Sequence, residues 1–95
     1  MSSQTIRLAG TALRELRVHF CQLSPASAGV RDFIANDYVP LKKANPDVPI
    51  LIREASGIVP RIWARYEHGV EKNVEVLDYS REKVTDAIRQ LANAK

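Results

Sequence analysis

The single cysteine, Cys21, is the residue with the clearest capacity for covalent chemistry. It precedes the Ser-Pro-Ala-Ser cluster at residues 24–27, so it should lie where a strand leads into a helix. Free N–H groups and partial positive charge at a helix N-terminus stabilise a thiolate. Ser24 stands where a C-x-x-C dithiol would have its second cysteine, and its hydroxyl could donate to the sulfur. These residues make a one-thiol redox site the first hypothesis; the alternative is a small buried apolar side chain, as free cysteine usually is.

A metal site is the second kind of chemistry to consider, because His19 lies two residues before Cys21 on the same side of an extended strand. His68 or nearby acids would have to complete it. Structural zinc sites carry several Cys and His ligands in paired spacing, and that pattern is missing. Phosphate-cradling glycine loops and the nucleophile elbow are missing too. We therefore expect no metal, no cofactor and no catalytic residue.

Arginine and aromatic residues gather in the stretch "ILIREASGIVPRIWARYEHGVE", on two strands that should be neighbours. Trp, Tyr and Arg are enriched at binding hot spots. The predicted partner interface comprises Arg53, Glu54, Trp63, Arg65 and Tyr66. The alternative is that the two aromatic residues fill the core while Arg53 and Glu54 pair at a strand end. Both faces of this strand cannot be buried in one small domain, so we expect Trp63 or Tyr66 to face outward.

Four segments have strand patterns. Alternating hydrophobicity predicts strands over residues 13–21, 61–67 and 70–77, the last two joined as an antiparallel hairpin. A continuous apolar run predicts another strand over residues 49–55, covered on both faces as a central parallel strand would be.

Two segments have helical periodicity, each preceded by a serine that can cap it. The first helix follows the serine cluster, and its apolar face comprises Val30, Phe33, Ile34, Tyr38 and Leu41. Pro40 removes a backbone donor, so we expect a kink or an early end near Asn36–Val39, then a linker over residues 42–49. The second helix follows Ser80, and its apolar face comprises Val84, Ala87, Ile88 and Leu91.

The resulting order, β-α-β-β-β-α, predicts an α/β fold with a four-stranded mixed sheet packed against helices. A helical crossover makes the first two strands parallel, and the hairpin adds antiparallel strands. This is a thioredoxin-like layout. We expect one such domain over residues 13–95 and a flexible N-terminal segment over residues 1–12.

Size and composition exclude several classes of protein. The 95 residues suffice for one domain, and a single cysteine rules out an intramolecular disulfide. No apolar run approaches the roughly 18 residues of a membrane span. The net charge of +3 comes from interspersed signs without a basic run, so we expect no nucleic-acid partner. The N-terminus has Arg7 and Arg14 and no acid before Glu15, a faint mitochondrial-targeting character.

Three long stretches resemble a known family: "LRELRVHFCQLSPASAGVRDFI", "YVPLKKANPDVPILIRE" and "PRIWARYEHGVEKNV", within residues 13–74. The chain is similar to the subunit 2 family of the NADH dehydrogenase [ubiquinone] 1 alpha subcomplex, the thioredoxin-like accessory subunits of mitochondrial respiratory complex I. The last helix matches more loosely.

The resemblance implies a non-catalytic subunit without flavin or iron–sulfur cluster, supporting assembly and stability of the respiratory chain complex. It implies a mitochondrial location on the matrix side of the inner membrane, peripheral to the membrane. The implied partners are other complex I subunits, above all the large iron–sulfur subunit of the NADH-oxidising module. Some members carry a second cysteine where Ala55 stands, so the cysteine pair proposed for redox regulation cannot form here.

Mitochondrial ribosomal proteins of the same superfamily are the structural alternative. They typically carry basic extensions suited to RNA phosphates. This sequence ends at Lys95, just after its last helix, and has a modest net charge, so we expect a complex I subunit rather than a ribosomal protein.

Overall fold

The computed structural model describes residue 8 and residues 11–93 of the chain. Its elements follow the predicted β-α-β-β-β-α order, with two short 3₁₀ turns added at Pro25–Ser27 (η1) and Glu67–Gly69 (η2). The strands are β1 (Leu13–Phe20), β2 (Ile50–Glu54), β3 (Arg61–Tyr66) and β4 (Glu71–Glu75), and the helices are α1 (Ala28–Ala44) and α2 (Arg81–Asn93). The predicted flexible segment 1–12 lies mostly outside the described residues.

The four strands form one mixed sheet in the order β2-β1-β3-β4. β1 pairs with β2 in parallel and with β3 antiparallel, and β4 pairs antiparallel with β3. The central position expected for residues 49–55 is therefore wrong, because β2 lies at the edge of the sheet. Its apolar run is explained by one-sided burial: Ile50 is buried, whereas Leu51 and Ile52 are half-buried. Hydrophobicity alone does not distinguish the two positions in a short run.

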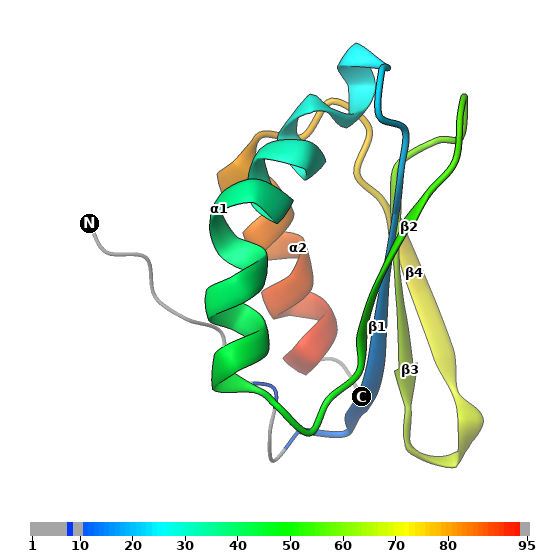
Figure 1. Ribbon diagram of the computed structural model, residues 1–95. Helices are drawn as coiled ribbons and strands as arrows, with labels where there is room; N and C mark the ends of the chain where they lie inside the picture. The colour runs from blue at the N-terminus through cyan, green and yellow to red at the C-terminus, as the bar shows by residue number, and fades with distance from the viewer. Residues whose placement is uncertain (1–7, 9–10, 94–95) are drawn as a thin grey trace.

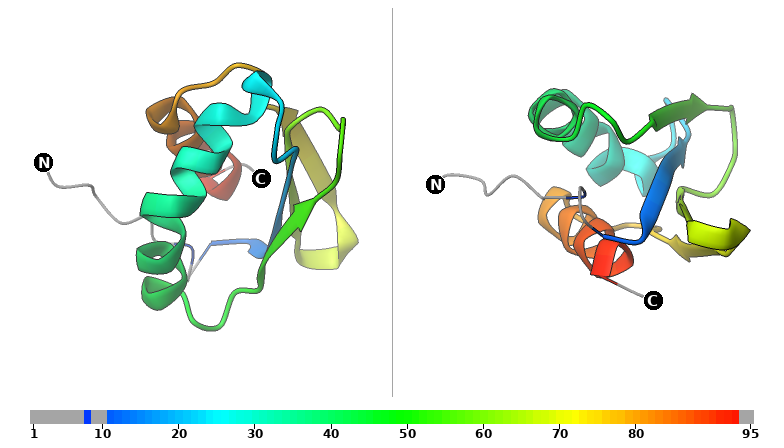
Figure 2. Two further views of the ribbon diagram at one scale, coloured as in Figure 1. Left: turned by 45° about the horizontal axis from the view of Figure 1, so that its top comes forward. Right: turned by 90° about the horizontal axis from the view of Figure 1, so that it is seen from below.

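Both helices cover the same face of the sheet and leave the opposite face without a covering layer (Figures 1 and 2). The inward side chains of β1 and β3 meet the apolar faces of α1 and α2 to form the core. Of the predicted helix faces, all members are buried except Ile34 and Tyr38, which pack partly buried against the core. The core also includes Leu8, which is fully buried. Its N–H donates to Oδ1 of the buried Asn45 at 2.7 Å.

The first helix passes through Pro40 and ends at Ala44, so the expected early end near Asn36–Val39 is wrong. A proline leaves the carbonyl four residues earlier without its helical donor. That carbonyl belongs to Asn36, which is exposed, as is Pro40 itself. Water can therefore take the place of the missing donor at low cost. The predicted linker accordingly begins later, after Ala44.

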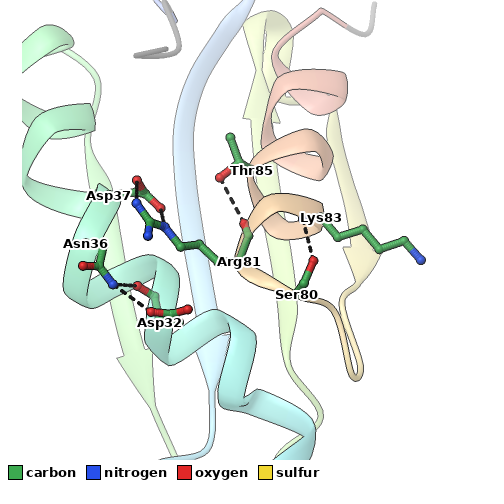
Figure 3. Close-up of polar contacts among 7 residues, drawn as sticks. All are labelled: Asp32, Asn36, Asp37, Ser80, Arg81, Lys83 and Thr85. Carbon is green, nitrogen blue, oxygen red and sulfur yellow. Dashed lines mark hydrogen bonds and ion pairs between the residues drawn. The ribbon is translucent and has the colours of Figure 1, made fainter. Parts of the chain in front are cut away.

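Polar side chains fix the start of α2 and its contact with α1 (Figure 3). Ser80 caps the helix as predicted: its Oγ accepts from the N–H of Lys83 at 3.2 Å. Arg81 reaches across to Asp37 on α1. The start of α1 also lies close to the loop before α2, since a Cβ added at Gly29 would lie 1.7 Å from the carbonyl oxygen of Tyr79.

Candidate functional site

The sheet face opposite the two helices carries no covering layer, and we call it the outer face. Alternation along β1 and β3 directs Leu16, Val18, Ile62 and Ala64 into the core, where each has 0% exposure. Their neighbours in sequence therefore point the other way. With the paired positions of β2 and β4, the outer face comprises Glu15, Arg17, His19, Leu51, Arg53, Arg61, Trp63, Arg65, Glu71, Asn73 and Glu75.

Strand register arranges these side chains in three rows across the sheet. The first row is Arg53, His19, Arg61 and Glu75, the second is Leu51, Arg17, Trp63 and Asn73, and the third is Glu15, Arg65 and Glu71. Neighbours within a row lie directly opposite one another on adjacent strands, the closest cross-strand relationship in a sheet.

The third row alternates in charge, and its members are paired. Arg65 lies 2.9 Å from the Glu15 carboxylate. Arg17, from the second row, approaches Glu71 at 3.3 Å and Glu15 at 3.7 Å. These pairs are partly exposed and contribute at most about 1 kcal/mol each. This part of the outer face is close to electrically neutral.

The first row is different, because Arg53, His19 and Arg61 lie side by side on three adjacent strands; we call these three residues the basic row. Arg61 contacts Oδ1 of Asn73 at 2.6 Å and lies 3.7 Å from Glu75. Among the described residues, Arg53 has neither a hydrogen bond nor an ion pair, and it is exposed. Burial, followed by the charges of Arg17, Arg53 and Arg61, lowers the pKa of His19 below 6.5. The basic row thus places one arginine on each side of His19, and of the two arginines only Arg61 has an acceptor nearby.

Trp63 lies in the middle of the outer face. Its ring is 5.9 Å from the guanidinium carbon of Arg17 and 6.4 Å from the His19 ring. A cation over an indole face is a favourable contact. The indole N–H is shielded from solvent and has no acceptor among the described residues. The prediction that one aromatic residue of β3 faces outward is confirmed, since Tyr66 lies in the core.

The five residues predicted as an interface do not form one surface. The expectation that their two strands are neighbours is wrong, because β1 lies between β2 and β3. Arg53, Trp63 and Arg65 share the outer face, with the strand of Arg53 separated from that of the other two by β1. Tyr66 is only 5% exposed, and its hydroxyl donates to the carbonyl of Leu91 at 2.5 Å. Glu54 has the inward parity of β2 and is exposed at the end of that strand.

The predicted interface lacks Arg17 and His19, and it lacks Arg61 although Arg61 lies in the same arginine- and aromatic-rich stretch. The sequence does contain a signal for these residues, because charged and core residues alternate along β1 and β3. This alternation places Arg17 and His19 on one face of β1, and Arg61, Trp63 and Arg65 on one face of β3. Joining those two sides requires the register between strands about 45 residues apart.

Cys21 lies at the edge of the core, immediately after β1, with 4% exposure. Its N–H donates to Oγ of Ser27, and its sulfur accepts the N–H of Gly57 at 3.3 Å. The Ser24 hydroxyl accepts from Ala26 N–H and so caps η1. Hydrogen bonds from the backbone N–H groups of Gly57, Leu23 and Ser24 lower the pKa of Cys21 below 9.0, against the opposing effects of burial and Glu54. The thiol is thus acidified but covered.

Hydrogen bonds connect the segment around Cys21 to β2 and α1. Ala55 directly follows β2, and its N–H donates to the carbonyl of Phe20 at 3.0 Å. Arg31 donates to the carbonyls of Cys21 and Ser24, both at 2.8 Å, and holds the loop against α1. Across the described residues, no three His, Cys, Asp or Glu side chains gather closely enough to hold a metal ion.

The chain matches a known protein family. The family model described as "Mitochondrial ribosomal protein L51 / S25 / CI-B8 domain" matches residues 30–81. The chain belongs to this family. The matched range contains β2, β3, β4 and all of α1 except its first two residues, so it covers Arg53, Arg61 and Trp63 of the outer face.

Individual relatives are more specific than the family description. The chain is 53% identical to mouse NADH dehydrogenase [ubiquinone] 1 alpha subcomplex subunit 2, over 92% of this chain and 88% of the mouse protein. It is 43% identical to the Arabidopsis thaliana protein of the same name, over 87% and 86% of the two chains. The mouse large ribosomal subunit protein mL43 is 26% identical over 85% of this chain but only 44% of its own length. In the described part of the chain, neither helix is long and apolar enough to cross a membrane.

Proposed function

We propose that this chain is a non-catalytic accessory subunit of mitochondrial NADH:ubiquinone oxidoreductase (complex I) with a thioredoxin-like fold. The observation that carries the proposal is 53% identity to a named subunit of NADH dehydrogenase over nearly the whole of both chains. The β-α-β-β-β-α order, with β1 between a parallel and an antiparallel neighbour, supports the thioredoxin-like assignment.

The subunit would dock on the matrix arm near the NADH-oxidising end, against the large iron–sulfur subunit, on the matrix side of the inner membrane. There it would support assembly and stability of the complex. The uncovered, charged face of the sheet offers a binding surface to another subunit, which supports a structural role. The low exposure of Cys21 supports a role without thiol chemistry.

Native electrophoresis of detergent-solubilised mitochondria tests this function. Mitochondria lacking the endogenous subunit would be supplied with the tagged chain, and the gel would be stained for NADH dehydrogenase activity. We expect the tag to co-migrate with that activity and the activity band to recover. Migration only as a free small protein would refute the proposal.

Ribosomal assembly is the alternative that the family description itself suggests. Identity to the ribosomal relative is about half that to the mouse dehydrogenase subunit, and the chain spans less than half of that relative. The outer face also carries Glu15, Glu71 and Glu75, which would repel RNA phosphates. Filter binding to mitochondrial ribosomal RNA with a steep salt dependence would favour the ribosomal function.

A one-thiol redox function is favoured by one observation, the three backbone N–H groups that lower the pKa of Cys21. A protein of this kind would reduce a glutathione mixed disulfide and return to its thiol with a second glutathione. Alkylation rates of the folded chain across a pH series would give the thiol pKa and its accessibility. We expect a pKa below 9.0 but alkylation well below that of the unfolded chain, and no glutathione-dependent turnover.

A further inference from the structure

The basic row has an electrostatic cost in the isolated chain. Like charges directly opposite one another on neighbouring strands are destabilising. Arg53 and Arg61 lie directly opposite His19, across β2–β1 and across β1–β3, so a proton on His19 would put three like charges side by side. The third row, two residues further along the same face, instead alternates Glu15, Arg65 and Glu71. The third row thus balances its arginine with carboxylates on both neighbouring strands, whereas the basic row has a carboxylate only at its far end.

Counterions for the basic row are few among the described residues. Glu75, at the far end of the row, lies 3.7 Å from Arg61. Arg53 makes no ion pair, and the groups that act on His19 are Arg17, Arg53 and Arg61, all of them positive. The shielded indole N–H of Trp63, in the next row, lacks an acceptor as well. This part of the outer face supplies more cations and donors than acceptors: Arg61 is matched by Asn73 and Glu75, whereas Arg53 and the indole N–H are not matched.

We propose that the basic row receives one or two carboxylates from an acidic segment of a neighbouring subunit, and that this contact orients the chain in the complex. The inference rests on the proposed function, since it names the surface and the partner chemistry through which the subunit would dock. Arginine guanidinium groups bind carboxylates in a bidentate geometry, and complementary charge fixes the register of an interface.

An acidic protein segment fits this surface better than a polyanion. An RNA strand crossing the outer face would pass over Glu15, Glu71 and Glu75, whereas one or two carboxylates need only reach Arg53 and His19. A carboxylate above His19 would also favour the imidazolium and offset the surrounding arginines. RNA or lipid bound to the row would therefore overturn the proposal.

The first test is a charge reversal, Arg53→Glu, with Lys43→Glu as the matched control. Lys43 is exposed in the last turn of α1, away from the sheet, and its reversal changes the net charge equally. Because the Arg53 side chain has no described partner and stands at the edge of the sheet beside His19, Arg53→Glu should leave the unfolding midpoint of the purified chain unchanged or raised. It should nevertheless reduce incorporation into the activity band at least about tenfold, while Lys43→Glu incorporates normally. Equal incorporation of both variants would overturn the proposal.

The second test identifies the contacting group. Arg53→Lys keeps the charge and introduces an amine that a zero-length carbodiimide can join to a carboxylate in direct contact. Carbodiimide treatment of the isolated complex should link position 53 of the variant to an Asp or Glu of another subunit, as peptide mass spectrometry would show. The wild-type chain, treated in the same way, should show no link at position 53. A variant that assembles without such a link would overturn the proposal. Failure of the wild-type chain to enter the complex would instead refute the proposed function itself.

Discussion

Arg81, the first residue of α2, holds Asp37 of α1 through two hydrogen bonds, Nε to Oδ2 at 2.7 Å and Nη2 to Oδ1 at 3.0 Å (Figure 3). The hydrogen bond with Asp37 also raises the pKa of Arg81. The pair joins two helices that contact the same face of the sheet but are far apart in sequence. It is partly buried, with 36% and 16% of the two side chains exposed.

This pair should couple the two helices energetically. A double-mutant cycle on Asp37→Ala and Arg81→Ala should give a coupling energy of about 1 kcal/mol, at the upper end for partly exposed pairs because the geometry is bidentate. The control is Asp86 and Arg89, which lie three residues apart within α2 at 2.9 Å and are more exposed. Their coupling should be about 0.3 kcal/mol. Equal couplings in urea unfolding would contradict the inter-helix role.

Gly29 should not tolerate a side chain. In an ordinary helix interior, Gly→Ala stabilises by about 1 kcal/mol. Here the new Cβ would lie 1.7 Å from the Tyr79 carbonyl oxygen, which is backbone and cannot rotate away. Gly29→Ala should therefore destabilise by about 3 kcal/mol as α1 is forced off the loop before α2. Ala35→Gly, at an exposed site in the same helix, is the control and should cost only about 1 kcal/mol. A rise in stability of Gly29→Ala would show that this close approach is absent.

Tyr66 should contribute through its hydroxyl as well as its ring. The hydroxyl donates to the Leu91 carbonyl in the last turn of α2, where backbone carbonyls have no helical partner. Burial raises the pKa of Tyr66 above 10.0, which keeps the donor protonated. Tyr66→Phe should cost about 1 kcal/mol in thermal unfolding. Tyr38→Phe is the comparison, because the Tyr38 hydroxyl has no described hydrogen bond, and its effect should be close to zero.

His19 should make the free chain less stable in mild acid. Its pKa is lowered below 6.5, so the unfolded chain binds the proton more tightly than the folded chain. Stability is therefore full above pH 6.5 and falls as the pH drops from 6.5 to the folded pKa. His19→Gln should remove this part of the pH dependence, as measured by urea midpoints across that window. His68→Gln, at the exposed hairpin turn, controls for the loss of a histidine. An unchanged slope in His19→Gln would contradict the electrostatic description of the basic row.

The sequence by itself determined the secondary-structure order, most of the core, and the serine caps of η1 and α2. These features depend on local patterns: alternation in β1 and β3, three- and four-residue periodicity in α1 and α2, and a serine before the first turn of each helical segment. The outward orientation of one aromatic residue in β3 also follows from alternation alone. The long matching stretches carried the family assignment, and the comparisons confirm it.

Only the tertiary structure decided which residues share a surface. β2 is an edge strand because β3 occupies the other side of β1, a long-range choice that an apolar run does not encode. Pro40 stays inside α1 because the carbonyl it frees is exposed to water. The basic row exists only through the register of three strands, which brings Arg53 and Arg61 to either side of His19. Such pairing depends on which distant segments pack together, and this is settled by burying the whole core at once rather than by any single segment.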